Sequence, residues 1–252
     1  MKKFVHKIIQ KLGYKLIRIK DLDNLSKVKN IAKPTIFKGY ISTEETVGAA
    51  QKMGLSVCDY VEKIWEQVGE TQKVIDKIEN YNCFTNAKSI CEIGAGTGRY
   101  MEKVIRKIGS YEKYVSYETA SDWAEWLEKE YNIIKRDTDG KSLKYEDDNS
   151  IDLVHAHGVF VYLSLINSFR YFKEMLRVTK KGGYIVFDLY TDEVFDLIVL
   201  NKWLISEHEY PVIIPVELIN GFFTNNNCQI IDKFKNKHGQ SYSQYYIIKK
   251  NG

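Results

Sequence analysis

From about residue 82 onward, short apolar segments alternate with longer segments whose hydrophobic residues recur every three or four positions. The short segments suit buried strands, and the longer ones suit helices that pack along one face. Candidate strands cover residues 88–93, 113–118, 131–135, 151–156 and 183–189, and a final pair covers 228–234 and 242–249. This alternation predicts an α/β domain with a mostly parallel, seven-stranded sheet, an antiparallel edge pair and helices on both faces.

The first 80 or so residues are mostly helical in pattern and lack this alternation. Five apolar residues recur on one helical face: Val57, Tyr60, Val61, Ile64 and Val68. Ser56 stands where an N-cap is expected. We therefore divide the chain into a helical N-terminal segment, residues 1–80, and a ligand-binding domain, residues 81–252. The polar stretch 40–45 is expected to cover part of the site.

Charge and cysteine content narrow the class of protein. Residues 2–20 hold seven Lys or Arg and no acid, with apolar residues at roughly helical spacing. Such a helix either packs on the protein body or makes weak contact with an anionic membrane surface, and the sequence leaves both open. The net charge of +4 is no nucleic-acid signature. Four scattered cysteines without a CxxC pair argue against a zinc site and against a disulfide framework. They predict a reducing, cytoplasmic setting.

The run from Glu92 to Gly98 carries the strongest functional signal. Strand 88–93 leads directly into Gly94-x-Gly96-x-Gly98, and a helix follows. Glycine permits positive φ angles and lets a ligand approach the main chain. Open parallel sheets bind ligands beyond the carboxyl ends of their strands, where the strand order reverses. Glu118 ends the second strand twenty residues after Gly98, where a carboxylate can accept hydrogen bonds from two ribose hydroxyls.

Two other nucleotide sites fit this loop poorly. A P-loop requires Gly-Lys-Ser/Thr, whereas Arg99-Tyr100 follows the last glycine. A dinucleotide fold requires glycine or alanine three residues after the second glycine, and that position is Arg99. The bulky side chain argues against NAD and FAD.

Four motifs, in the right order, resemble those of class I S-adenosylmethionine (SAM)-dependent methyltransferases, which have a Rossmann-like fold. ICEIGAGTGRY resembles their glycine-rich motif, YETA their acidic loop, DTDGKSL with DDNSIDLV their third-to-fourth strand segment, and LRVTKKGGYIVFD the approach to their fifth strand. The resemblance covers about residues 85–190. It implies SAM as the cofactor and makes residues 81–252 a SAM-binding domain with a helical cap.

The resemblance assigns eight residues to the cofactor: Glu92, Gly94, Gly96, Gly98, Glu118, Thr119, Asp139 and Gly140. The glycine loop is implied to shape the methionine end of the site and Glu118 to bind the ribose. Asp139 is implied to reach the adenine amino group, with Asp137 as the alternative.

His155 and His157, at the end of the fourth strand, are the candidate catalytic residues. In this family the loop after that strand faces the sulfonium and the acceptor. Methyl transfer to a hydroxyl requires alignment and deprotonation, and histidine suits the second task. Period-two spacing places both rings on one side, with His157 nearer the open end as the favoured base. The alternative is that one or both only hydrogen-bond to neighbouring strands or loops.

The acceptor is the least specified feature. Tyr162, Asp188 and Tyr190 are candidate substrate contacts, and no residue set demands a metal. The chain resembles methyltransferases of bacterial capsule and surface-polysaccharide clusters, which implies O-methylation of a small polar acceptor: a sugar, phosphate or phosphoramidate group, free or nucleotide-linked.

Three arginines are candidate contacts for an anionic acceptor: Arg99, Arg136 and Arg170. The alternatives are an NAD-dependent sugar-modifying oxidoreductase and a non-catalytic SAM-binding protein.

Overall fold

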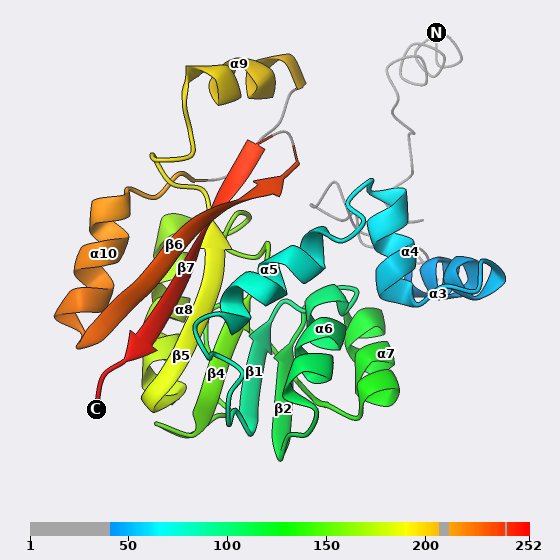
Figure 1. Cartoon of the computed structure of the whole chain (residues 1–252), viewed down its shortest axis with the longest axis horizontal. Helices are drawn as coiled ribbons and strands as arrows, with labels where there is room; N and C mark the ends of the chain where they lie inside the picture. The colour runs from blue at the N-terminus through cyan, green and yellow to red at the C-terminus, as the bar shows by residue number, and fades with distance from the viewer. Residues whose placement is uncertain (1–40, 207–211, 240) are drawn as a thin grey trace, which may run out of the picture. The chain divides into compact units, whose positions relative to one another are not determined.

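The computed structural model describes residues 41–206, 212–239 and 241–252, and residues 42–252 form one compact unit (Figure 1). Its seven-stranded sheet has the order β3-β2-β1-β4-β5-β7-β6. The strands are β1 (Ser89–Ile93), β2 (Lys113–Tyr117), β3 (Ile134–Arg136), β4 (Ile151–Ala156), β5 (Thr179–Leu189), β6 (Cys228–His238) and β7 (Ser241–Lys250). Strands β1 to β5 pair in parallel, whereas β7 runs antiparallel to both β5 and β6. The predicted α/β fold with an antiparallel edge pair is confirmed.

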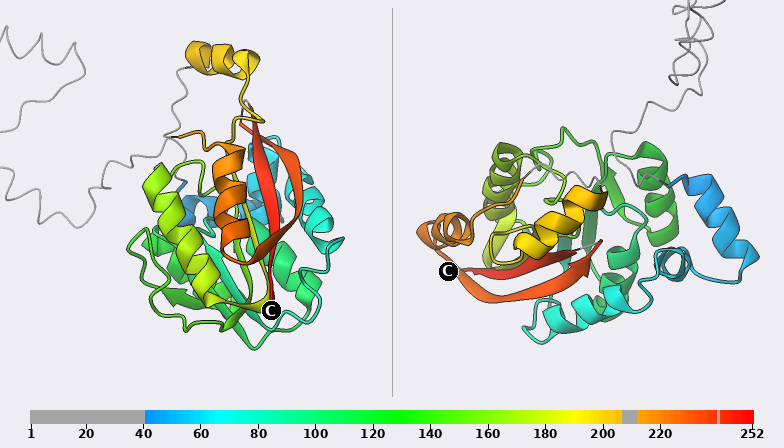
Figure 2. Two further views of the ribbon diagram at one scale, coloured as in Figure 1. Left: turned by 90° about the vertical axis from the view of Figure 1, so that its left-hand side faces the viewer. Right: turned by 90° about the horizontal axis from the view of Figure 1, so that it is seen from above.

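Helices cover both faces of this sheet (Figures 1 and 2). They are α3 (Thr43–Lys52), α4 (Val57–Ile64), α5 (Glu70–Glu79), α6 (Arg99–Ile108), α7 (Ser121–Tyr131), α8 (Leu165–Val178), α9 (Leu197–Ser206) and α10 (Val216–Asn225). The period-two alternation of the strands produces two cores. On β1, Ile90 joins the core under α5, α6 and α7, while Cys91 joins the core under α8 and α10.

Two serines start the helices that precede the sheet. The Ser42 hydroxyl accepts a hydrogen bond from the Glu45 amide at the start of α3, and the Ser56 hydroxyl accepts one from the Asp59 amide at the start of α4. Helix α4 ends at Ile64, so Val68 lies beyond the helix that its spacing predicts. The basic stretch 2–20 and its proposed membrane contact lie outside the described residues.

Three predicted boundaries shift. The third strand begins at Ile134 rather than residue 131, because α7 continues to Tyr131 and Asn132 ends it in a left-handed conformation. The fifth strand begins at Thr179 rather than residue 183, and its pairing with β4 shifts register between Ile151 and Leu153. The last two strands are longer than predicted, so the hairpin projects beyond the sheet edge (Figure 1).

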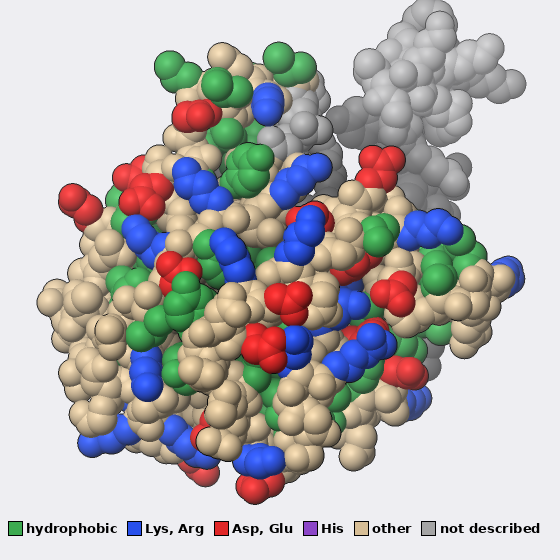
Figure 3. Space-filling model, in the orientation of Figure 1, with side chains coloured by type: hydrophobic (Ala, Val, Ile, Leu, Met, Phe, Trp, Pro, Cys, Tyr) green, Lys and Arg blue, Asp and Glu red, His purple; other side chains and the backbone are tan. Residues whose placement is uncertain are grey.

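The surface mixes both signs of charge over the face shown in Figure 3. Hydrophobic side chains gather over α9, where Leu197, Leu204 and Ile205 are exposed. Within the described residues, no helix has the length and apolar character to cross a membrane.

We expect Phe172→Ala to be strongly destabilising, because Phe172 is fully buried and packs against the rings of Phe160, Phe187 and Phe223. Truncation of a buried phenylalanine costs about 3–5 kcal/mol of unfolding free energy. Urea denaturation followed by circular dichroism measures this cost. Ile166→Ala, on the exposed side of the same helix, is the control and should stay within about 0.5 kcal/mol of wild type. Equal midpoints for the two variants would contradict the assignment of this core.

Candidate functional site

The loop after β1 is packed at its ends and open at its middle. Gly94, Gly96 and Gly98 all have positive φ angles, of 65°, 54° and 79°. A Cβ at Gly94 would lie 2.6 Å from Val159 Cγ2, and one at Gly98 would lie 2.5 Å from Leu127 Cδ2. A Cβ at Gly96 meets no atom within 4 Å. The backbone at Gly96 is therefore the part of the loop that a ligand can approach closely, as a SAM site requires.

Glu118 lies against this loop from the end of β2. Its Oε2 accepts a hydrogen bond from the Gly96 amide at 2.6 Å, and its Oε1 accepts one from the Ala120 amide at 2.8 Å. The carboxylate also lines a pocket of about 240 Å³ together with Thr119, Asp137 and Thr138. This pocket adjoins the glycine loop through Glu118, which suits the ribose and adenine of the cofactor.

The structure distinguishes the two candidate adenine ligands. Asp137 lines the pocket, whereas Asp139 does not. The Asp139 carboxylate accepts hydrogen bonds from the Lys141 amide at 3.0 Å and from the Ser142 amide at 2.8 Å, so it closes its own turn. Gly140 lies within that turn at a φ angle of 74°. Asp137 is therefore the better placed of the two carboxylates.

Glu92 belongs to a buried polar cluster beneath the loop. The Tyr114 hydroxyl donates to Glu92 Oε2 at 2.6 Å and lies 3.0 Å from His155 Nε2. Because the hydroxyl proton goes to Glu92, His155 Nε2–H is the donor to Tyr114. Burial raises the pKa of Glu92 to about 8 and lowers the pKa of His155 to about 3. Both side chains are thus neutral at pH 7, and His155 supports the structure rather than facing a pocket.

His157 follows β4 directly and lies in a second polar chain. Its ring stacks on Tyr100 with centroids 3.7 Å apart, and its Nδ1 lies 3.2 Å from the Tyr245 hydroxyl. That hydroxyl donates to the Tyr100 hydroxyl at 3.1 Å. The Tyr245 proton is therefore committed, so His157 Nδ1–H donates and Nε2 carries the lone pair. Nε2 is buried without a hydrogen-bond partner in the described part of the chain.

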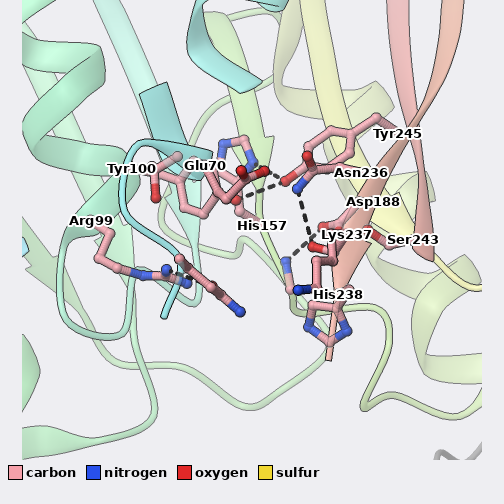
Figure 4. A pocket seen from close by; sticks show the side chains of 13 residues that line it. Glu70, Arg99, Tyr100, His157, Asp188, Asn236, Lys237, His238, Ser243 and Tyr245 are labelled. Atoms are coloured by element: carbon pink, nitrogen blue, oxygen red, sulfur yellow. Dashed lines mark hydrogen bonds between the residues drawn. The ribbon is translucent and has the colours of Figure 1, made fainter. Parts of the chain in front are cut away.

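A cavity of about 50 Å³ lies beside His157 (Figure 4). Its walls come from the start of α5, the start of α6, the ends of β4 and β5, and the β6–β7 hairpin. Asp188 lines it, accepting a 2.6 Å hydrogen bond from the Gly158 amide, and burial raises the pKa of Asp188 to about 6. Burial lowers the pKa of His157 well below its usual range. At pH 7 the lining thus offers a neutral histidine beside a carboxylate.

The two other candidate substrate contacts do not line this cavity. Tyr190 is buried, and its hydroxyl lies 2.7 Å from His238 Nδ1. Tyr162 is 42% exposed and meets the edge of the same His238 ring. His238 itself lines the cavity, so both tyrosines contact a residue of the cavity wall.

Several lining residues escaped the sequence analysis. Tyr100, Lys237, His238 and Tyr245 all line the cavity. Tyr100 ends the glycine-rich motif, whereas no motif or spacing marks the other three. Tyr100 alone was within reach, since it directly follows Arg99 after the glycine loop. The three others belong to the hairpin, and only its pairing beside β5 brings them to the site.

The three candidate arginines have different surroundings, and one of them lines the cavity. Arg99 lines the cavity, Arg136 forms an ion pair with the buried Glu146, and Arg170 lies exposed on α8 with its Nη1 donating to Asn167. Among residues 41–206, 212–239 and 241–252, no group of three or more His, Cys, Asp or Glu side chains is arranged to hold a metal ion.

Comparisons with known proteins agree with this geometry. A family model described as "Methyltransferase domain" matches residues 91–187, which run from within β1 to within β5. No curated protein matches the chain in a sequence comparison.

Among solved structures, the fold is similar to an O-methyltransferase family protein from Burkholderia thailandensis, with a TM-score of 0.57 and 13% identity over 92% of this chain and 70% of that one. It is also similar to magnesium protoporphyrin IX methyltransferase from Synechocystis PCC 6803, solved with bound SAH, with a TM-score of 0.56 and 11% identity over 100% of both chains. A third is geranyl diphosphate C-methyltransferase from Streptomyces coelicolor A3(2), with a TM-score of 0.55 and 13% identity over 77% of this chain and 84% of that one. These structures share the fold, and the names of the second and third give different methyl acceptors.

We expect Glu92 to make the protein less stable as the pH rises from 6.5 to 8. The folded protein keeps the Glu92 proton up to a pKa of about 8, whereas the unfolded chain releases it near the ordinary value of 4.5. The unfolding free energy therefore falls with pH, by up to about 1.4 kcal/mol per pH unit from this group. In Glu92→Gln this contribution is absent.

Urea denaturation of both proteins at four pH values in this window measures the difference in slope. The two buried histidines also titrate near 6.5 in the unfolded chain, and Asp188 near 6 in the folded protein. These contributions are the same in wild type and in Glu92→Gln, so the difference between the two slopes reports Glu92. Parallel curves for wild type and Glu92→Gln would show that Glu92 is already ionised in the folded protein.

Proposed function

We propose that this chain is a class I SAM-dependent methyltransferase that transfers the SAM methyl group to an oxygen of a small polar acceptor, in line with the methyltransferase-domain model that matches residues 91–187. The observation that carries the proposal is the His157 side chain. It lies at the carboxyl end of β4, lines the cavity beside the glycine loop, and presents a lone pair at Nε2. An acceptor hydroxyl needs such a group to take its proton.

The chain supplies three functions for this reaction. Gly96 and Glu118 hold the cofactor close to the backbone, with Thr119 and Asp137 along its adenosine side. Tyr245 and Tyr100 hold the His157 ring in one orientation and one tautomer, by a hydrogen bond and by stacking. His157 Nε2 accepts the hydroxyl proton as the acceptor oxygen bonds to the methyl carbon. SAM supplies a methyl group bound to a sulfonium sulfur. When the carbon–sulfur bond breaks, the sulfur keeps the electron pair, and neutral S-adenosylhomocysteine (SAH) leaves.

The acceptor class rests on the sequence resemblance together with this site. We propose a sugar hydroxyl, phosphate or phosphoramidate group of a precursor for bacterial capsule or surface polysaccharide, methylated in the cytoplasm. The polar lining of the cavity, with His157, Asp188 and Ser243, supports a hydrophilic acceptor. The small cavity volume supports recognition of one polar group rather than a macromolecule. The NAD-dependent oxidoreductase is not favoured, because the family match and the fold both point to SAM.

We expect His157→Gln to lose at least about 100-fold in turnover while it keeps its affinity for SAH, since general-base catalysis contributes about 10²–10⁴-fold. Glu118→Ala should show the opposite pattern, with weakened SAH binding. Turnover is measured as SAH released during a screen of nucleotide-linked sugars and phosphorylated metabolites, with methylated products identified by mass. SAH and NAD affinities are measured by calorimetry.

This pair of variants also separates catalysis from simple cofactor binding. A non-catalytic SAM-binding protein would bind SAH and give no methylated product with any acceptor in the screen. Unchanged turnover in His157→Gln would remove the base from the proposal, and binding of NAD in place of SAH would remove the proposal itself.

A further inference from the structure

Two cations that line the cavity beside His157 have no acidic partner within residues 41–206, 212–239 and 241–252. Arg99, the first residue of α6, and Lys237, from the β6–β7 hairpin, line the cavity from different elements (Figure 4). Neither side chain makes an ion pair with any residue that the structure describes. The other arginine in a pocket, Arg136, is neutralised by Glu146. The charges of Arg99 and Lys237 are therefore not offset by an ion pair within the described part of the chain.

Neutral groups hold Arg99 in place. Its guanidinium lies over the Trp65 ring at 4.7 Å, and its Nη1 donates to Gln67 Oε1 at 3.2 Å. Stacking and an amide hydrogen bond orient a guanidinium without consuming its charge. The remaining donors of the guanidinium stay available for a ligand.

The two carboxylates of the cavity do not cancel this charge. Glu70 forms its ion pair with Lys73, outside the lining, at 2.6 Å. Asp188 is 2% exposed and already accepts the Gly158 amide. Burial raises the pKa of Asp188 to about 6, because it disfavours the ionised form of the carboxyl group. The uncompensated charge on the lining is therefore positive.

We propose that Arg99 and Lys237 bind a phosphoryl group carried by the methyl acceptor, next to the oxygen that is methylated. This inference rests on the proposed function, because it names the acceptor of that reaction. A guanidinium and an ammonium from different elements match a group with several anionic oxygens better than they match a neutral sugar. His157 lines the same cavity of about 50 Å³, so the phosphoryl group and the reacting oxygen belong to neighbouring parts of the acceptor.

Phosphoryl binding also affects the base. The positive charge of Arg99 contributes to the lowered pKa of His157, although burial is the larger cause. An anion bound to Arg99 offsets that repulsion and raises the proton affinity of His157. An acceptor without the phosphoryl group would bind more weakly, and His157 would take up its hydroxyl proton less readily.

The test uses inorganic phosphate as the probe and the full chain saturated with SAH. Phosphate is titrated at constant ionic strength, and binding is followed by the ³¹P line width, with acetate as the competing carboxylate. The variants are Arg99→Gln and Lys237→Gln. The matched controls are Arg170→Gln and Lys173→Gln, which remove exposed cations from α8. SAH affinity is measured for each protein by calorimetry.

We expect phosphate to bind the SAH complex of the wild type and of both controls. Its affinity should fall by at least about tenfold in Arg99→Gln and in Lys237→Gln, while SAH affinity stays within about twofold. Acetate should compete poorly.

Four results would overturn the inference: the same phosphate affinity in all five proteins, displacement of phosphate by SAH, weaker SAH binding in Arg99→Gln, or acetate binding as tight as phosphate. Displacement by SAH or weaker SAH binding would assign Arg99 to the carboxylate of the cofactor. Because the assay involves no methyl transfer, its outcome is independent of whether His157 acts as the base.

Discussion

The left-handed bend at residues 94–98 is the constraint on which the site depends. Three positive φ angles within five residues turn the chain from β1 into α6, and only glycine adopts them without strain. The Gly94 amide donates to the Tyr117 carbonyl at 2.8 Å, and the Gly96 amide donates to Glu118. These two bonds tie the bend to the end of β2. The position of the Glu118 carboxylate is therefore set by the same loop whose backbone is open at Gly96.

A buried polar layer lies between the sheet and α6, and its burial decides the charge states of its side chains. Glu92 and His155 share Tyr114, while His157 shares Tyr245 with Tyr100, and the two histidine rings lie 5.2 Å apart. Ionising any of these groups would place a charge in a medium of low dielectric constant, so each stays neutral at pH 7. Neutrality gives His157 its lone pair, and the hydroxyl relay fixes which nitrogen carries it. The positive charges next to this layer are those of Arg99 and Lys237, which line the cavity.

The cofactor half of the site could be predicted from the sequence because its signals are local. The glycine loop, Glu118 and His157 each follow a strand directly. Parallel strands bring their carboxyl ends to one edge of the sheet. The error at the third strand is local as well. Helix α7 continues to Tyr131 and ends at the left-handed Asn132, and the sequence does not distinguish this helix end from the start of a strand. The choice between Asp137 and Asp139 required coordinates, since the Asp139 turn is visible only through its hydrogen bonds to Lys141 and Ser142.

The acceptor half could not be predicted in this way, because it depends on a strand that pairs out of sequence order. β7 inserts between β5 and β6, with Asp188 opposite Tyr245. That register carries Tyr245 to His157 across 88 residues of sequence and places Lys237 and His238 at the cavity. No periodicity in residues 228–249 indicates which neighbour β7 will choose. The cavity beside His157 is thus lined in part by a hairpin that carries none of the four sequence motifs, and the fold by itself does not fix an acceptor.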